Sequence, residues 1–165
     1  MAETEQPPES VLDTLDEAPP LGLFTRLSRV GLHLAQLQNG VSADLGLPYS
    51  DFTILNTLRR YGEQGGLPVL KLGRLVMRPP GSMTLILDRL AKADLIERRA
   101  IPEDRRSVLI ALTPTGEEVA RRGAETYDAL QQRVLAGVGE SEVADIDQAV
   151  RRLLEILEDA SEDPA

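Results

Sequence analysis

Residues 75–116 read LVMRPPGSMTLILDRLAKADLIERRAIPEDRRSVLIALTPTG, and the change of pattern within this stretch decides the fold. Apolar residues recur at helical spacing in residues 70–77 and again in residues 81–92. Between these segments Pro79 and Pro80 force a turn, because proline suits the first turn of a helix but not its interior. The spacing therefore predicts a helix-turn-helix.

The pattern that follows is typical of strands. Residues 95–99 are a short β-compatible run and residues 107–112 an apolar run of strand length, with the charged residues 101–106 between them. We predict a β-hairpin whose loop is the charged segment. Thr113 and Pro114 then suit the N-cap and first position of a helix, which we expect to end at about Val138.

A further helix precedes the helix-turn-helix, from Pro48 to Tyr61. Ser50 and Asp51 lie near its start, where a side-chain acceptor and a negative charge suit the free N–H groups. The stretch 62–68 contains three glycines and is predicted to be a loop.

Narrow apolar stripes run along the predicted helices near both ends of the chain. The first consists of Leu23, Leu27, Val30, Leu34, Leu37 and Val41. The second lies on a helix that starts near Glu140, and consists of Val143, Ile146, Val150, Leu153 and Leu157. Stripes of this spacing pack against another helix, so we predict that two copies of the chain form a homodimer.

The net charge of −9 is unevenly distributed. Residues 1–20 carry six acids, no base and four prolines, and are predicted to be a disordered tail. Residues 70–112 carry nine bases against five acids. Nucleic-acid binding needs local cations and not a basic protein, but charge alone leaves open whether this segment is only solvated surface.

The chain lacks the residues that several classes of enzyme and metal-binding protein require. The chain has no cysteine and one histidine, and it contains no glycine-rich phosphate loop and no hydrolase or metalloprotease motif. We predict no enzymatic activity, no catalytic or metal site and no cofactor. No apolar run reaches the roughly 18 residues of a membrane span, and the N-terminus lacks a secretion signal. We therefore expect a cytoplasmic protein with no membrane partner.

The residues 104–116, DRRSVLIALTPTG, carry a specific motif: Asp-x-Arg, an apolar strand, and Leu-Thr-x-x-Gly. Together with Met83-Thr84, Asp88-Arg89-Leu90 and residues 95–99, this segment resembles the MarR (multiple antibiotic resistance regulator) family. The resemblance implies a mainly α fold with a small β-hairpin wing (α+β), which is a winged helix-turn-helix between N- and C-terminal dimerisation helices. We divide the chain into an acidic tail (1–20), an N-terminal dimerisation helix (21–47), the winged domain (48–116), C-terminal dimerisation helices (117–160) and a flexible tail (161–165).

The resemblance also implies that the partner is double-stranded DNA, with the helix 81–92 in the major groove. Ser82, Met83 and Thr84 open this helix, where side chains face base edges. The alternative for Ser82 is that it only caps the helix. Leu85 stands where many family members have arginine or another polar residue, and it can touch a thymine methyl group but cannot contact guanine bidentately.

The wing supplies the second predicted DNA contact. The family pattern marks Arg106 for the minor groove, with Asp104 orienting its guanidinium and Arg105 as a further contact. The alternative is that Asp104 and Arg106 form only a surface ion pair, which contributes little to stability.

Other basic residues are candidates for phosphate contacts. Arg98 and Arg99 point to opposite faces of a strand, so at most one of them, for which we take Arg99, faces DNA. Lys71, Arg74 and Arg78 lie on or just after the first helix of the motif, which crosses the DNA backbone, although solvated surface charge explains them nearly as well.

The family further implies a repressor that binds a pseudo-palindromic operator and is released by a small aromatic or lipophilic effector. The effector pocket would lie between the dimerisation helices and the winged lobe, with His33, Tyr49 and Phe52 as candidates. From the residues alone, His33 is interpreted as a partly buried structural histidine, and Tyr49 and Phe52 as core.

A different class of function stays open at this stage. The apolar stripes and the acidic ends also suit a helical interaction module that binds protein partners and not DNA. Salt dependence separates the two, because DNA binding weakens steeply as salt rises.

Overall fold

The computed structural model describes residues 21–62, 65–101 and 104–162, and at positions 21, 80, 101, 104–107, 161 and 162 it describes the backbone only. The chain divides into two units, the first ending at Ala124 and the second starting at Glu125. The predicted tail 1–20 lies outside the described residues, whereas residues 161 and 162 continue the last helix. Within the described residues no helix combines the length and the apolar character needed to cross a membrane.

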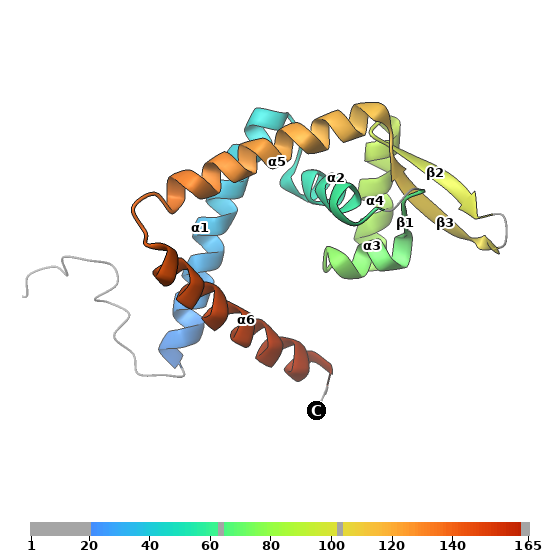
Figure 1. Cartoon of the computed structure of the whole chain (residues 1–165). Helices are drawn as coiled ribbons and strands as arrows, with labels where there is room; N and C mark the ends of the chain where they lie inside the picture. Colours follow the sequence, from blue (N-terminus) through green and yellow to red (C-terminus); the bar gives the residue numbers. More distant parts are fainter. Residues whose placement is uncertain (1–20, 63–64, 102–103, 163–165) are drawn as a thin grey trace, which may run out of the picture. The chain divides into compact units, whose positions relative to one another are not determined.

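The order of elements agrees with the prediction, and the mainly α fold with a small sheet is confirmed (Figure 1). The elements are α1 (Leu21–Leu45), α2 (Tyr49–Tyr61), β1 (Leu67–Pro68), α3 (Val69–Leu75), α4 (Pro80–Lys92), β2 (Ile96–Ile101), β3 (Asp104–Leu112), α5 (Pro114–Val134) and α6 (Glu140–Glu162).

The hairpin strands extend further than predicted. β2 and β3 are antiparallel, and their pairing runs from Ile96 opposite Leu112 to Ile101 opposite Asp104. The prediction of a loop over residues 101–106 is therefore wrong for most of that segment. Asp104, Arg105 and Arg106 lie on β3, and a strand can carry charged residues because the pairing of its backbone groups does not depend on the side chains.

The predicted loop 62–68 is wrong at its last two residues, which form β1. Leu67 pairs with Ile110 and Pro68 with Leu109, so the sheet has the order β1-β3-β2. Gly66 precedes this pair at φ +103°, and a Cβ atom there would lie 2.2 Å from the carbonyl oxygen of Ile110. The close approach of the two backbones therefore requires glycine.

The hydrophobic core of the first unit lies between α2, α3, α4, the sheet and the start of α5. Its buried members are mostly leucine and isoleucine, as expected for a chain that is only 3% aromatic. They are Ile54, Leu55, Leu58, Leu67, Leu72, Met83, Ile86, Leu87, Leu90, Leu95, Ile96, Ile110 and Ala120.

The turn between α3 and α4 begins with a helix-ending motif. The N–H of Arg78 donates to the carbonyl of Gly73 (2.9 Å) and the N–H of Met77 to that of Arg74 (3.1 Å). Met77 has φ 51°, the left-handed conformation that this motif needs at its turning residue and that glycine usually supplies. The motif stops α3, and the two prolines that follow start α4 in a new direction.

The Leu-Thr-x-x-Gly motif holds the hairpin against the start of α5. Thr113 is the N-cap, as predicted, because its Oγ1 accepts from the N–H of Gly116 (3.0 Å). The same hydroxyl donates to the carbonyl of Asp94 (2.6 Å). Gly116 sits so close to Leu95 that a Cβ atom would lie 1.8 Å from the Leu95 carbonyl oxygen. α5 ends at Val134, earlier than predicted, and Gly137 follows in the left-handed region.

The apolar stripes remain largely exposed in the single chain. On α1, Leu23, Val30 and Leu34 are exposed and only Val41 is buried. On α6 the exposed apolar residues are Ile146, Val150, Leu154, Ile156 and Leu157. Contiguous apolar surface of this kind is typical of a protein–protein interface.

Replacing Gly116 with Ala is expected to lower the free energy of unfolding by about 2 kcal/mol, because the new methyl group collides with the backbone of Leu95. Urea denaturation at one fixed protein concentration measures the effect. The control is Gly40→Ala in α1, whose Cβ meets nothing within 4 Å, and which should gain about 0.5 to 1 kcal/mol. A Gly116→Ala variant as stable as the parent protein would contradict this account of the motif.

Candidate nucleic-acid interface

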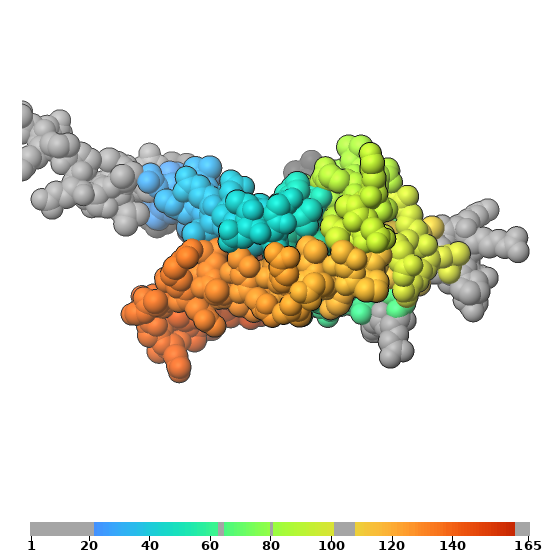
Figure 2. All heavy atoms as spheres, turned by 90° about the horizontal axis from the view of Figure 1, so that it is seen from above, coloured from blue at the N-terminus to red at the C-terminus, as the bar shows by residue number. Residues whose placement is uncertain are grey.

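Helix α4 has one buried face and one exposed face. Met83, Ile86, Leu87 and Leu90 point into the core, at the spacing of one helical stripe. The opposite face carries Gly81, Thr84, Leu85, Asp88 and Lys92, which are exposed. Figure 2 shows the lime-green atoms of α4 at the surface, beside the yellow atoms of β2. An exposed helix flanked by a hairpin is the arrangement in which a helix enters the major groove.

Met83 corrects one prediction. Its side chain is 1% exposed and packs in the core, so it cannot reach a base edge. The pattern Ser82-Met83-Thr84 does not by itself show which of three successive residues faces inward. The packing of α4 on α2 and α3 decides it.

Ser82 is not the cap of α4. The N-cap is Pro79, and no side chain caps this end. The hydroxyl of Ser82 instead donates to the carbonyl of Pro79 (2.9 Å), so the capping alternative is wrong. Ser82 is half-buried, whereas Leu85 is 71% exposed. A leucine with that much surface in water contributes little to the core.

A groove of about 540 Å³ lies between α3 and α4. Its lining is mainly apolar, with Arg74 and Arg78 added from α3 and the turn. The lining residues are Val69, Leu70, Gly73, Arg74, Met77, Arg78, Pro79, Met83 and Thr84. Arg74 and Arg78 are exposed and form no ion pair within the described part of the chain. The structure thus places two available cations beside the exposed face of α4.

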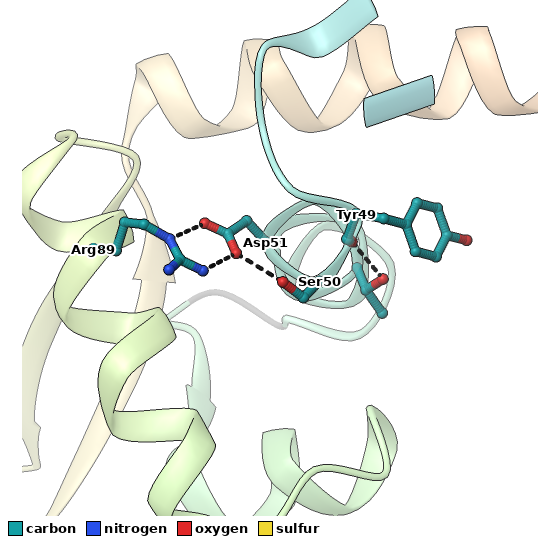
Figure 3. A network of polar contacts seen from close by, with 5 residues as sticks. Tyr49, Ser50, Asp51 and Arg89 are labelled. Carbon is teal, nitrogen blue, oxygen red and sulfur yellow. Dashed lines mark hydrogen bonds and ion pairs between the residues drawn. The ribbon is translucent and has the colours of Figure 1, made fainter. Parts of the chain in front are cut away.

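The arginine of α4 itself is engaged in an ion pair with α2 (Figure 3). Arg89 donates through Nε to Oδ2 of Asp51 (2.7 Å) and through Nη2 to Oδ1 (2.5 Å). The carboxylate of Asp51 is fully buried, while the Arg89 side chain is 51% exposed. Ser50 adds a hydrogen bond to Oδ1 of Asp51 (3.0 Å). The hydrogen bonds that Arg89 donates to Asp51, and the Coulomb attraction to the same carboxylate, raise the pKa of Arg89, which therefore stays charged.

The predicted role of Asp51 needs correction. Neither Ser50 nor Asp51 caps α2, because the N-cap is Pro48 and no side chain hydrogen-bonds there. Asp51 is the anchor for Arg89, which follows it by 38 residues. No local pattern signals a pair at that separation, although Asp88-Arg89-Leu90 belonged to the segment that carried the family resemblance.

Arg98 and Arg99 point to opposite sides of β2, as the strand pattern predicted. Arg98 pairs with Asp88 of α4 (2.6 Å), and Arg99 pairs with Glu97 (2.5 Å). Arg99 also lines a separate cavity of about 170 Å³ together with Arg59. Both ion pairs are exposed and so contribute little to stability. Arg98 is therefore the residue that lies on the side of α4, whereas the prediction chose Arg99 as the DNA contact.

The three predicted wing residues lie on the described backbone of β3. Their side chains, those of Asp104, Arg105 and Arg106, lie outside the described residues. The structure confirms that they lie on a hairpin, whose strand β2 contacts α4, and their DNA contacts stay predictions.

The candidate effector residues lie on two helices. His33 on α1 is exposed, so its interpretation as a partly buried histidine is wrong for the single chain. Tyr49 and Phe52 pack ring against ring with their centroids 5.8 Å apart, and Phe52 is a core residue, as the residues alone indicated. A pocket shared by the three stays a prediction.

Comparison with known proteins agrees with this geometry. The model of the MarR family matches residues 47–108. The HTH-type transcriptional regulator PecS of Dickeya dadantii (strain 3937) is 34% identical over 128 residues, which cover 78% of this chain and 76% of that protein.

Two solved structures share the fold. The S. aureus MepR–DNA complex has a TM-score of 0.71 at 19% identity, covering 84% of this chain and 98% of that one. CouR from Rhodococcus jostii RHA1, bound to p-coumaroyl-CoA, has a TM-score of 0.67 at 20% identity, covering 79% of this chain and 90% of that one. The family resemblance carried by residues 75–116 is confirmed.

Replacing Arg89 with Met is expected to lower the free energy of unfolding by about 2 kcal/mol, because it leaves the buried carboxylate of Asp51 without its counter-charge. The cost stays near the low end for buried pairs because Arg89 is half exposed. The double variant Asp51→Asn/Arg89→Met should lose less than Arg89→Met alone, since it also removes the buried charge. Denaturant titration measures both. A double variant that loses more than the single variant would exclude Asp51 as the reason for the effect.

Proposed function

Because this chain belongs to the MarR family, we propose that it is a homodimeric transcriptional regulator that inserts α4 of each protomer into the major groove of DNA. The observation that carries this proposal is the exposed face of α4, with the hairpin on one side and Arg74 and Arg78 on the other, two cations that form no ion pair with any described residue. Thr84 and Leu85 would face base edges, and Ser82 would lie at the margin of the contact.

The cations are placed for the DNA backbone. Arg74 and Arg78 on the α3 side of the groove, with Lys71 on the same helix, would contact phosphates and set the position of α4. Arg105 and Arg106 on the wing would contact the adjacent minor groove, with Asp104 orienting Arg106. Arg99 is less favourably placed than Arg98, because Arg98 is the one that lies against α4.

The exposed stripes of α1 and α6 support a dimer built from the two ends of the chain. Covering them with the same surfaces of a second copy would remove several leucine, isoleucine and valine side chains from water. A two-fold dimer suits a pseudo-palindromic operator with half-sites about 34 Å apart.

The regulator is proposed to act as a repressor that a small aromatic or lipophilic effector releases. MepR in complex with DNA and CouR bound to p-coumaroyl-CoA share the fold, and they support a DNA site and a ligand site on one scaffold. His33, Tyr49 and Phe52 are retained as candidates for the effector pocket. The effector would bind more tightly to a form of the dimer in which the spacing of the two winged lobes does not match the two half-sites. It would then weaken DNA binding by the ratio of its affinities for the two forms of the dimer.

Duplex DNA from the region upstream of the protein's own gene should be shifted by the full chain, and the affinity should fall steeply between low and high salt. Replacing Arg106 with Ala should weaken binding on the order of tenfold, because it removes a wing contact. Arg152→Ala on α6 is the control, since Arg152 is exposed and forms its ion pair with Glu155 on the same helix. An unchanged affinity of the Arg106→Ala variant removes the wing from the mechanism, and no shift at low salt favours the protein-binding alternative.

Replacing Ile146 with Asp should convert the dimer to monomers, because it puts a charge into the apolar stripe of α6. Light scattering measures the mass, and DNA affinity should fall with it because two half-sites no longer bind together. Gln148→Asp, on the opposite face of α6, should leave the dimer intact. A dimeric Ile146→Asp variant would place the interface elsewhere.

A further inference from the structure

The base-contacting part of α4 is unusually poor in hydrogen-bonding side chains. Its basic residues are Arg89 and Lys92, and both lie in the last turn. The helix contains no asparagine or glutamine. Bidentate contacts to guanine need arginine or lysine, and those to adenine need asparagine or glutamine. The first two turns of α4 therefore lack every side chain that makes a bidentate contact with a purine.

Two of the three charged residues further along α4 are already paired, and the third lies too far along the helix. Arg89 is held by the buried carboxylate of Asp51, and Asp88 is held by Arg98. Lys92 lies seven residues beyond Leu85, which is about 10 Å along the helix axis. It is therefore placed outside the turns that contact bases in this class of motif.

What the first two turns do present is apolar surface. Leu85 is 71% exposed, and the methyl-bearing Thr84 is exposed next to it. Met77, in the turn between α3 and α4, is 82% exposed and lines the same groove as Thr84. The one apolar group that a base pair displays in the major groove is the C5 methyl of thymine.

We infer that Leu85 is a specificity-determining residue and that α4 selects its half-site by apolar contact with thymine methyl groups, not by hydrogen bonds to guanine. This inference rests on the proposed function, which supplies the DNA. Leu85 makes the central contact, with the methyl group of Thr84 beside it. The phosphate contacts of Arg74 and Arg78 then supply affinity without base preference.

The test begins with selection of bound duplexes from a randomised 30-base-pair library by the full chain. Each thymine of the selected site is then replaced singly by deoxyuridine, which lacks only the C5 methyl group. We expect at least one position in each half-site where the Kd rises about fourfold, the factor for one buried carbon of this size. In Leu85→Ala the same replacement should have no effect. Leu75→Ala, an exposed leucine of α3 outside the groove, should keep the parent response.

The outcomes separate this inference from the function on which it rests. If duplexes are selected but no deoxyuridine replacement changes the Kd, the inference about Leu85 is wrong, while the proposed DNA-binding function stands. The same holds if Leu85→Ala keeps the full sensitivity to the missing methyl group. If no duplex is enriched at low salt, the proposed DNA binding is wrong, and so is the recognition of thymine methyl groups that depends on it.

Discussion

The buried carboxylate of Asp51 is the constraint on which the exposed face of α4 depends. A charge removed from water needs a partner, and the partner here is Arg89 on α4. Two parallel hydrogen bonds join a planar guanidinium to a planar carboxylate, so they fix α4 along its axis and also in rotation against α2. The rotation of α4 determines which of its side chains face solvent. The ion pair therefore acts together with the packing of α4 on α2 and α3 to set which side chains the outer face presents.

The charges around α4 follow from the same arrangement. Arg89 is engaged by α2, and Asp88 binds Arg98 of the hairpin, so the middle of the exposed face carries little free charge. Available cations remain on the α3 side, at Arg74 and Arg78. The surface therefore combines an apolar centre at Leu85 with cations at its border. In the proposed complex with DNA, such a surface would separate base selection from phosphate binding.

The family motif has a structural explanation in this chain. Its threonine caps α5 and donates a hydrogen bond to the carbonyl of Asp94, two residues after the end of α4, and its glycine leaves room for the carbonyl of Leu95. The hairpin, α4 and α5 therefore meet at one backbone junction. The motif and the cap at Thr113 could be predicted from the sequence, but the strands around residues 101–106 are longer than predicted. Charged side chains made that segment resemble a loop, although backbone pairing does not depend on them.

The sequence by itself determined the order of helices and strands, the position of the helix-turn-helix and the two apolar stripes. These features rest on local chemistry: apolar spacing, prolines that cannot continue a helix, and a threonine that caps one. Tertiary structure alone decided that Met83 is buried, that Leu67 and Pro68 form a strand, and that Arg89 binds Asp51. Each of these depends on residues that are distant in the chain and meet only on folding, so no local pattern encodes it.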